Sequence, residues 1–173
     1  MKSELFKRIL SSVIIIPFAF FFIIKGSVFF IFFISACFLI ASYEWYMMSK
    51  SKLYNIPGHL FLIISFFSAF LWREYLSLSF EPFLLIILIC ISTDIGGYIF
   101  GKLFKGPKLT KISPNKTYSG VIGGYLIMFI SIFFYTKFSD FYTLNLWLNL
   151  YNIIFLFIVS TFSQLGDIII SYF

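Results

Sequence analysis

Long, uninterrupted apolar stretches dominate this chain and predict helices that span a membrane. Six of them stand out, at about residues 9–25, 26–44, 59–73, 82–101, 119–136 and 147–167. A helix needs about 20 apolar residues to cross the hydrocarbon core of a bilayer, whereas a transmembrane β-barrel would alternate apolar and polar residues in short runs. The pattern therefore predicts an all-α, polytopic membrane protein with about six transmembrane helices. The third stretch is the shortest and follows Pro57 and Gly58.

The composition excludes the main alternatives to a membrane protein. Of the 173 residues, 61% are hydrophobic and only 12% are charged, whereas soluble domains average about 45–50% apolar and about 25% charged residues. A chain with so few charges is neither an ordinary soluble domain nor a disordered segment. Because no internal repeat or low-complexity linker interrupts it, we expect residues 1–173 to form a single membrane-embedded domain.

The basic residues predict the orientation of the helices. The net charge of +6 would suggest a nucleic-acid partner in a soluble protein, but basic cytosolic loops are the rule in membrane proteins, so no nucleic acid is expected. With a cytosolic N-terminus, the outer segments carry only Lys25, Arg73 and Lys137. The inner segments carry Lys2, Lys7, Arg8, Lys50, Lys52, Lys102, Lys105, Lys108, Lys111 and Lys116. This bias predicts a cytosolic N-terminus in a multi-pass protein of the cell (inner) membrane.

Asp94 and Asp167 are the two carboxylates that call for a functional explanation. Asp94 lies inside the apolar stretch 83–100, about 18 Å along a helix that starts at Pro82, and an acid within the membrane is by default a functional group. Asp167 follows the apolar run 151–166 and falls at the predicted cytosolic interface, so both carboxylates come to the same membrane face. Such a pair suits a hard divalent cation such as Mg²⁺. It equally suits a proton or Na⁺ relay in a transporter.

The segment 102–116 contains five lysines and no acidic residue. Pro107 and Pro114 prevent it from forming one continuous helix. The ordinary excess of lysines in cytosolic loops explains the positive charge of this segment. It does not explain why hydroxyl residues and a glycine cluster follow the lysines directly. Lysines, hydroxyls and exposed backbone N–H groups at a helix start are a phosphate-binding combination. The glycine spacing also favours close helix packing, and the two roles are compatible. The residues concerned are Lys102, Lys108, Ser113, Lys116, Thr117, Gly120, Gly123 and Gly124.

Three blocks of the sequence together resemble a known enzyme family. The first block is Asp94-Ile-Gly-Gly-Tyr-Ile-Phe-Gly-Lys102, the second is Ser113-Pro-Asn-Lys-Thr-Tyr-Ser-Gly-Val-Ile-Gly-Gly124, and the third is Ser163-Gln-Leu-Gly-Asp167. In this order they are similar to CDP-diacylglycerol synthase of the bacterial type, the phosphatidate cytidylyltransferase. The second block is the most specific part, and the resemblance runs through the whole chain.

The resemblance implies an activity and a set of site residues. The family converts CTP and phosphatidic acid into CDP-diacylglycerol and pyrophosphate at the cytosolic face of the membrane, with Mg²⁺ as cofactor. It implies Asp94 and Asp167 as catalytic metal ligands and Lys116 as a further catalytic residue. Ser163 and Gln164 would join the lysines, hydroxyls and glycines of the preceding loop in binding substrate. The expected partners are CTP, phosphatidic acid and the lipid bilayer, with a homodimer left open.

One difference from the family concerns the C-terminus. In the family, the third block leads into further acidic and basic residues, including a Pro-Gly-His-Gly-Gly stretch, whereas this chain ends at Phe173. We therefore interpret the chain as truncated and expect it to make little CDP-diacylglycerol by itself. Three alternatives stay open, namely an ion-coupled membrane transporter that uses Asp94 and Asp167, a CTP-dependent lipid kinase, and an inactive fragment of the family.

Overall fold

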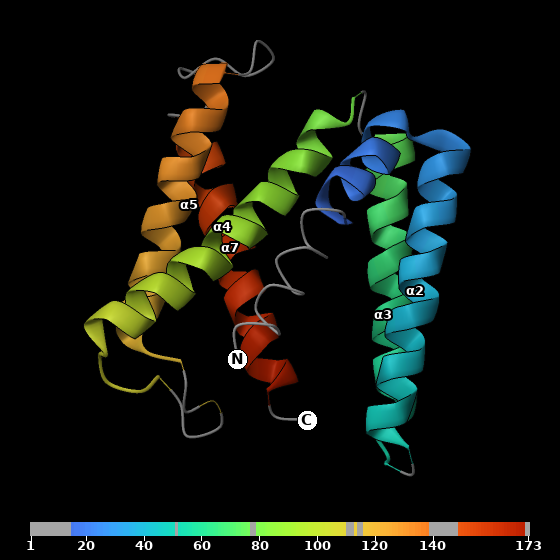
Figure 1. Ribbon diagram of the computed structural model, residues 1–173, viewed down its shortest axis with the longest axis horizontal. Coiled ribbons are helices and arrows are strands. Elements are labelled where there is room, and N and C mark those ends of the chain that lie inside the picture. The colour runs from blue at the N-terminus through green and yellow to red at the C-terminus, as the bar shows by residue number, and fades with distance from the viewer. Residues whose placement is uncertain are drawn as a thin grey trace, which may run out of the picture. The chain divides into compact units, whose positions relative to one another are not determined.

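The computed structural model describes residues 15–50, 52–76, 79–109, 113, 116–138 and 149–171. Within these ranges, five helices are long and apolar enough to cross a membrane. They are α2 (Ser27–Ser49), α3 (Asn55–Leu71) continued by the π-turn η1 (Trp72–Leu76), α4 (Glu81–Phe104), α5 (Tyr118–Phe138) and α7 (Leu150–Ile170) (Figure 1). The prediction of an all-α polytopic membrane protein is confirmed.

The helix bounds differ in detail from the predicted ones. The first predicted span is represented by the helix Ile15–Lys25, and its start lies outside the described residues. Helix α3 begins four residues earlier than predicted, at Asn55, because Pro57 falls in the first helical turn, where its missing N–H breaks no helical hydrogen bond. Helix α2 continues to Ser49, so Glu44 is exposed inside this helix rather than at its end.

The contacts divide the chain into two compact units, residues 1–83 and 84–173. In the first unit, α2 and α3 run side by side (Figure 1). The indole N–H of Trp45 donates to the carbonyl of Asn55 at 3.1 Å, and the Asn55 amide donates to Ser49 Oγ at 2.9 Å. A Cβ at Gly58 would lie 2.0 Å from the Trp45 ring. Hydrogen bonds and one glycine contact therefore fix the connection between the two helices.

At the other end of the first unit, η1 holds the turn between the helix Ile15–Lys25 and α2. Arg73 Nε donates to the carbonyl of Ile23 at 2.8 Å, and the carboxylate of Glu74 accepts the Ser27 N–H at 3.0 and 3.1 Å. A cation thus lies at a helix C-terminus and an anion at a helix N-terminus, which is the favourable arrangement for both helix dipoles. Gly26 makes the turn with a φ of 65°.

The second unit consists of α4, α5 and α7, which share one apolar core. Its buried members come from all three helices and are Leu85, Ile89, Met128, Ile132 and Leu156. Many of the other large apolar side chains on these helices are exposed. A soluble protein rarely leaves so much apolar surface in water, whereas a helix in a bilayer exposes it to lipid.

Close packing of α4 on α5 depends on glycines. A Cβ at Gly96 would lie 2.4 Å from the carbonyl oxygen of Gly123, and one at Gly120 would lie 2.9 Å from the carbonyl oxygen of Gly97. Both distances are too short for a real side chain, so only glycine lets the two backbones approach this closely. The close-packing role that the glycine spacing indicated is confirmed.

Candidate functional site

A small cavity of about 40 Å³ lies in the second unit, between α4, α7 and the start of α5. Its polar lining comes from all three parts of the chain, with Asp94 on α4, Lys116 and Thr117 just before α5, and Gln164 on α7. One water needs about 10–15 Å³ of such volume, so the cavity has room for a cation or a few waters. A nucleotide would have to lie outside it and reach in with one group.

Asp94 faces this cavity from the middle of α4. Ser163 Oγ donates to Asp94 Oδ1 across a long 3.5 Å contact. The charge of Asp167 repels that of Asp94, and the charge of Lys116 attracts it. The carboxylate therefore lies within electrostatic reach of both charged residues that the sequence singled out, although these follow it by 22 and 73 positions.

Asp167 lies in the last turn of α7 and forms an ion pair with Lys116, whose Nζ is 2.5 Å from Asp167 Oδ2. A negative side chain at this end of a helix is unfavourable, because the helix dipole is itself negative there. Lys116 offsets that repulsion. The side chains are 39% and 45% exposed, so both can exchange partners with a ligand from solution.

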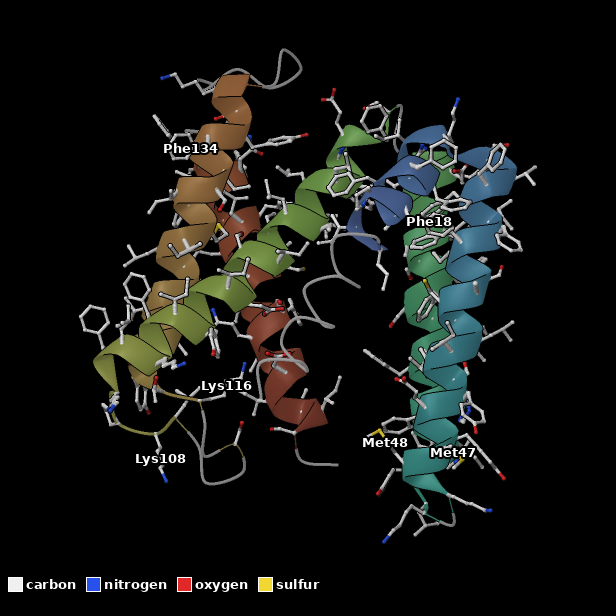
Figure 2. All side chains as sticks on the ribbon, in the orientation of Figure 1. Phe18, Met47, Met48, Lys108, Lys116 and Phe134 are labelled. Carbon is white, nitrogen blue, oxygen red and sulfur yellow. The ribbon has the colours of Figure 1, made fainter. Side chains whose placement is uncertain are left out.

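The position of Lys116 is set by its backbone. Its carbonyl accepts the Leu109 N–H at 2.8 Å, and its own N–H donates to the Ser113 carbonyl at 3.1 Å. The N–H of Tyr118 donates to the Pro107 carbonyl at 3.1 Å, so the two arms of the segment are paired. This pairing holds Lys116 beside α7, and Figure 2 shows its side chain extending toward that helix.

Thr117 caps the N-terminus of α5. Its Oγ1 accepts the N–H of Gly120 at 3.2 Å, which satisfies one of the free amides at the helix start. It also lies 3.0 Å from Ser119 Oγ, which in turn accepts the Gly106 N–H at 3.3 Å. Thr117 and Gly120 line the cavity, but the hydroxyl and the amide are already bonded to each other.

The other predicted site residues lie at varying distances from the cavity. Lys102 contacts Tyr98 on its own helix, with Nζ 5.6 Å from the ring centre. Lys108 is exposed, and Figure 2 shows its side chain pointing away from the helices. Ser113 is buried, with 7% of its surface exposed. Gly123 and Gly124 pack in the helix interface against α4. The substrate-binding roles of these residues stay predictions.

The sequence reasoning missed one buried polar contact next to this cavity. Thr93 Oγ1 and Ser160 Oγ lie 2.9 Å apart, with the two residues 1% and 0% exposed. The only available signal was spacing, because Thr93 precedes Asp94 and Ser160 lies seven residues before Asp167, on the same helical face.

The donor set around the cavity fits a hard cation in part. Asp94 at the cavity and Asp167, the ion-pair partner of the cavity residue Lys116, supply two carboxylates, and Ser163 and Gln164 add neutral oxygens nearby. In the part of the chain that the structure describes, no cluster of three or more His, Cys, Asp or Glu side chains forms. Because Mg²⁺ retains several waters and commonly takes one or two protein carboxylates plus substrate phosphates, this set is compatible with it.

Fold and site together define a helical membrane protein in which one carboxylate and one lysine line a small cavity and a second carboxylate is ion-paired with that lysine. The sequence profile of the cytidylyltransferase family matches residues 6–83 and 59–173. The chain belongs to this family.

Two similar proteins are named phosphatidate cytidylyltransferase and come from Rickettsia. The one from Rickettsia bellii is 34% identical over 180 positions, covering 99% of this chain and 76% of the relative. The one from Rickettsia conorii is 33% identical over 183 positions, with the same coverage of 99% and 76%. A phosphatidate cytidylyltransferase of Staphylococcus haemolyticus is 46% identical over 83 positions, 47% of this chain and 30% of the relative. No solved structure matches the chain.

Proposed function

We propose that this chain is a phosphatidate cytidylyltransferase, which makes CDP-diacylglycerol and pyrophosphate from CTP and phosphatidic acid. The observation that carries the proposal is that Asp94 and Lys116 line one cavity, while Asp167 is ion-paired with Lys116 and interacts electrostatically with Asp94. Relatives that bear this name align with 99% of the chain. A lipid substrate also accounts for an enzyme that is embedded in the membrane.

The reaction does not require a general base or a protein nucleophile. The phosphate of phosphatidic acid is a phosphomonoester with a second pKa of about 6, so it is largely ionised near neutral pH. One of its oxygens attacks the α-phosphorus of CTP, and the bond from that phosphorus to the bridging oxygen of the β-phosphate breaks. Pyrophosphate leaves with the bonding electrons. The protein has to align the two phosphates and stabilise their negative charge.

Two residues at the cavity and two exposed lysines away from it have roles in that scheme. Lys116 holds a phosphate of CTP, with its flexible ammonium group exchanging Asp167 for the substrate. Gln164 offers an amide donor to the cavity, because its buried Nε2 has no hydrogen-bond partner among the described residues. The exposed Lys102 and Lys108 raise the local concentration of the anionic nucleotide.

Mg²⁺ is the proposed cofactor, and Asp94 and Asp167 are the residues that would hold it. When bound, it would neutralise charge on the phosphates of CTP. The proposed location is the cytoplasmic (inner) membrane, with the cavity opening toward the cytosol. The predicted bias of lysines toward that side and the supply of CTP there support this orientation.

The decisive assay uses the purified chain in detergent with Mg²⁺, phosphatidic acid and CTP labelled in the cytidine. We run it on the chain itself and on a version with a family-type C-terminal extension. The proposal predicts a cytidine-bearing lipid in at least one form. Label that enters lipid only from the γ-phosphate of CTP would identify a lipid kinase instead, and no labelled lipid in either form would refute the proposal.

The site assignment is tested by removing one charge at a time. Asp94→Asn and Asp167→Asn should each abolish nearly all transfer while the protein still folds. Glu81→Gln is the matched control, because Glu81 is the first residue of α4 and lies at the opposite end of the helix from Lys102. Near-normal turnover in either aspartate variant would overturn the metal-site assignment.

A further inference from the structure

The Thr93–Ser160 contact joins α4 to α7 in the interior of the second unit. The oxygen–oxygen distance is 2.9 Å, and both residues are almost completely buried. A hydroxyl inside a membrane helix usually bonds a carbonyl one turn back on its own helix. The neighbouring Ser92 does so, donating to the Leu88 carbonyl at 2.6 Å. Thr93 and Ser160 instead bond each other across two helices, which fixes one helix against the other.

This contact includes one residue of the cavity lining, Thr93, and lies beside the others. On α4, Thr93 directly precedes Asp94. On α7, Ser160 is followed at three, four and seven positions by Ser163, Gln164 and Asp167, and these spacings place all four on one helical face. A shift of one residue moves a helix by about 1.5 Å and turns it by about 100°. Such a shift would rotate a carboxylate out of the cavity.

The third helix packs on the same point. A Cβ at Gly124 of α5 would lie 3.0 Å from the Thr93 carbonyl oxygen and 3.2 Å from Gln164 Nε2. Three helices therefore converge where the two hydroxyls meet. The amide of Gln164, whose Nε2 is buried and lacks a partner among the described residues, is held between this point and the cavity.

We propose that Thr93 and Ser160 are positioning residues for the transfer reaction. Their hydrogen bond sets the rotation and the axial register of α4 on α7, so that Asp94 and Gln164 line one cavity and Asp167 reaches Lys116 beside it. Thr93 lines the cavity, and the structure engages its hydroxyl with Ser160, so we assign the pair no contact with substrate. The expected effect on kcat rests on the proposed function. The claim that the contact sets the position of α4 on α7 rests on the observed hydrogen bond alone.

Thr93→Val removes the hydroxyl with almost no change in shape, whereas Thr93→Ser keeps the hydroxyl and removes only the methyl group. The matched control is Tyr125→Phe, because the Tyr125 hydroxyl also makes one contact with α7, 2.8 Å from Thr161 Oγ1. Thr161 keeps its bond to the Phe157 carbonyl at 2.6 Å, whereas Thr93→Val leaves the buried Ser160 hydroxyl without its Thr93 partner. Both substitutions delete one interhelical hydrogen bond, but Thr93→Val should lower thermal stability more, because a buried hydroxyl without a partner carries an added cost.

The first readout needs neither substrate nor activity. Spin labels are placed at two exposed positions, Leu103 on α4 and Ile169 on α7, and the distance distribution between them is measured by pulsed electron paramagnetic resonance. Thr93→Val should shift or broaden this distribution, while Thr93→Ser and Tyr125→Phe should leave it unchanged. A distribution that Thr93→Val does not change overturns the proposal.

The second readout separates positioning from stability. In the active form of the chain, Thr93→Val should lower kcat about 10- to 100-fold, as expected when reacting groups are misplaced by about 1 Å, with little change in the KM for CTP. Tyr125→Phe should keep kcat near the wild-type value. Equal kcat losses in both variants would mean that only stability matters. If wild type transfers no cytidylyl group but the label distances respond as expected, the proposed function fails and the geometric inference stands.

Discussion

Lys116→Met tests whether the ion pair at the cavity serves stability or substrate binding. The substitution keeps most of the aliphatic side chain and removes the charge. Because the Lys116 and Asp167 side chains are 39% and 45% exposed, solvent screens their attraction, and such exposed pairs contribute about 0–1 kcal/mol to stability. The loop around Lys116 is held by backbone hydrogen bonds that methionine preserves. The free energy of unfolding should therefore fall by less than about 1 kcal/mol.

The expected effect on catalysis is much larger. A hydrogen bond to a charged group contributes about 1.5–3 kcal/mol, and about 1.4 kcal/mol corresponds to a factor of ten. Losing the Lys116 contact with a CTP phosphate should then lower kcat/KM about 10- to 150-fold. Lys108→Met is the control for lost loop charge, because this exposed lysine points away from the helices and should contribute only to long-range attraction of the nucleotide, so its loss should be smaller. Equal losses in both variants would mean that only the general positive charge of the loop matters.

The same substitution has a second, opposite consequence. Lys116 competes with a divalent cation for Asp167, so removing it should tighten the binding of Mn²⁺ in the absence of nucleotide. Electron paramagnetic resonance titration of free Mn²⁺ measures this affinity without any turnover. A weaker affinity for Mn²⁺ in Lys116→Met than in wild type would show that Lys116 does not compete with the cation for Asp167.

Three further outcomes are expected. Gly96→Ala should destabilise the protein by about 1–3 kcal/mol in thermal unfolding, because the added Cβ would lie 2.4 Å from a backbone oxygen of α5. The control Gly166→Ala should be neutral or stabilising, because its added Cβ has no neighbour within 4 Å. Glu74→Gln should cost about 1–2 kcal/mol, because the carboxylate accepts a backbone N–H at the start of α2, and unchanged unfolding would refute that cap. A cysteine at position 115 should react with a membrane-impermeant reagent only after the cells are permeabilised, whereas a cysteine at position 140 should react in intact cells. Reaction of position 115 in intact cells would reverse the predicted topology.

The helical spans and the meeting of the charged residues could be predicted from the sequence. Continuous apolar runs fix the helix locations, and the cost of a carboxylate in an apolar stretch singles out Asp94. The alternation of spans then brings Asp167 to the same membrane face as Asp94. In the structure, Asp167 is paired with Lys116, one of the five lysines of the segment 102–116. Each of these inferences depends on local pattern or on simple counting along the chain.

The residues that hold the helices in place could not be found in this way. Arg73 and Glu74 stand at the end of an apolar stretch, where charged residues are normally solvated, yet they bond to backbone groups 47 to 50 positions away. Thr93 and Ser160 are ordinary small polar residues in an apolar context, and their contact spans 67 positions. Such partners depend on how the helices pack, and the periodicity of either helix alone does not specify them.

The glycines near the cavity explain why the packing and the site cannot be separated in this fold. Glycine at positions 97 and 120 lets α4 and α5 approach until backbone meets backbone, and this approach brings the start of α5 beside Asp94. Lys116 and Thr117 directly precede that helix start, so their distance from the carboxylate follows from the helix contact. A larger residue would push the helices apart and would also move Lys116 away from Asp94. The glycine spacing in this segment is therefore a geometric requirement of the charged cavity as well as a packing motif.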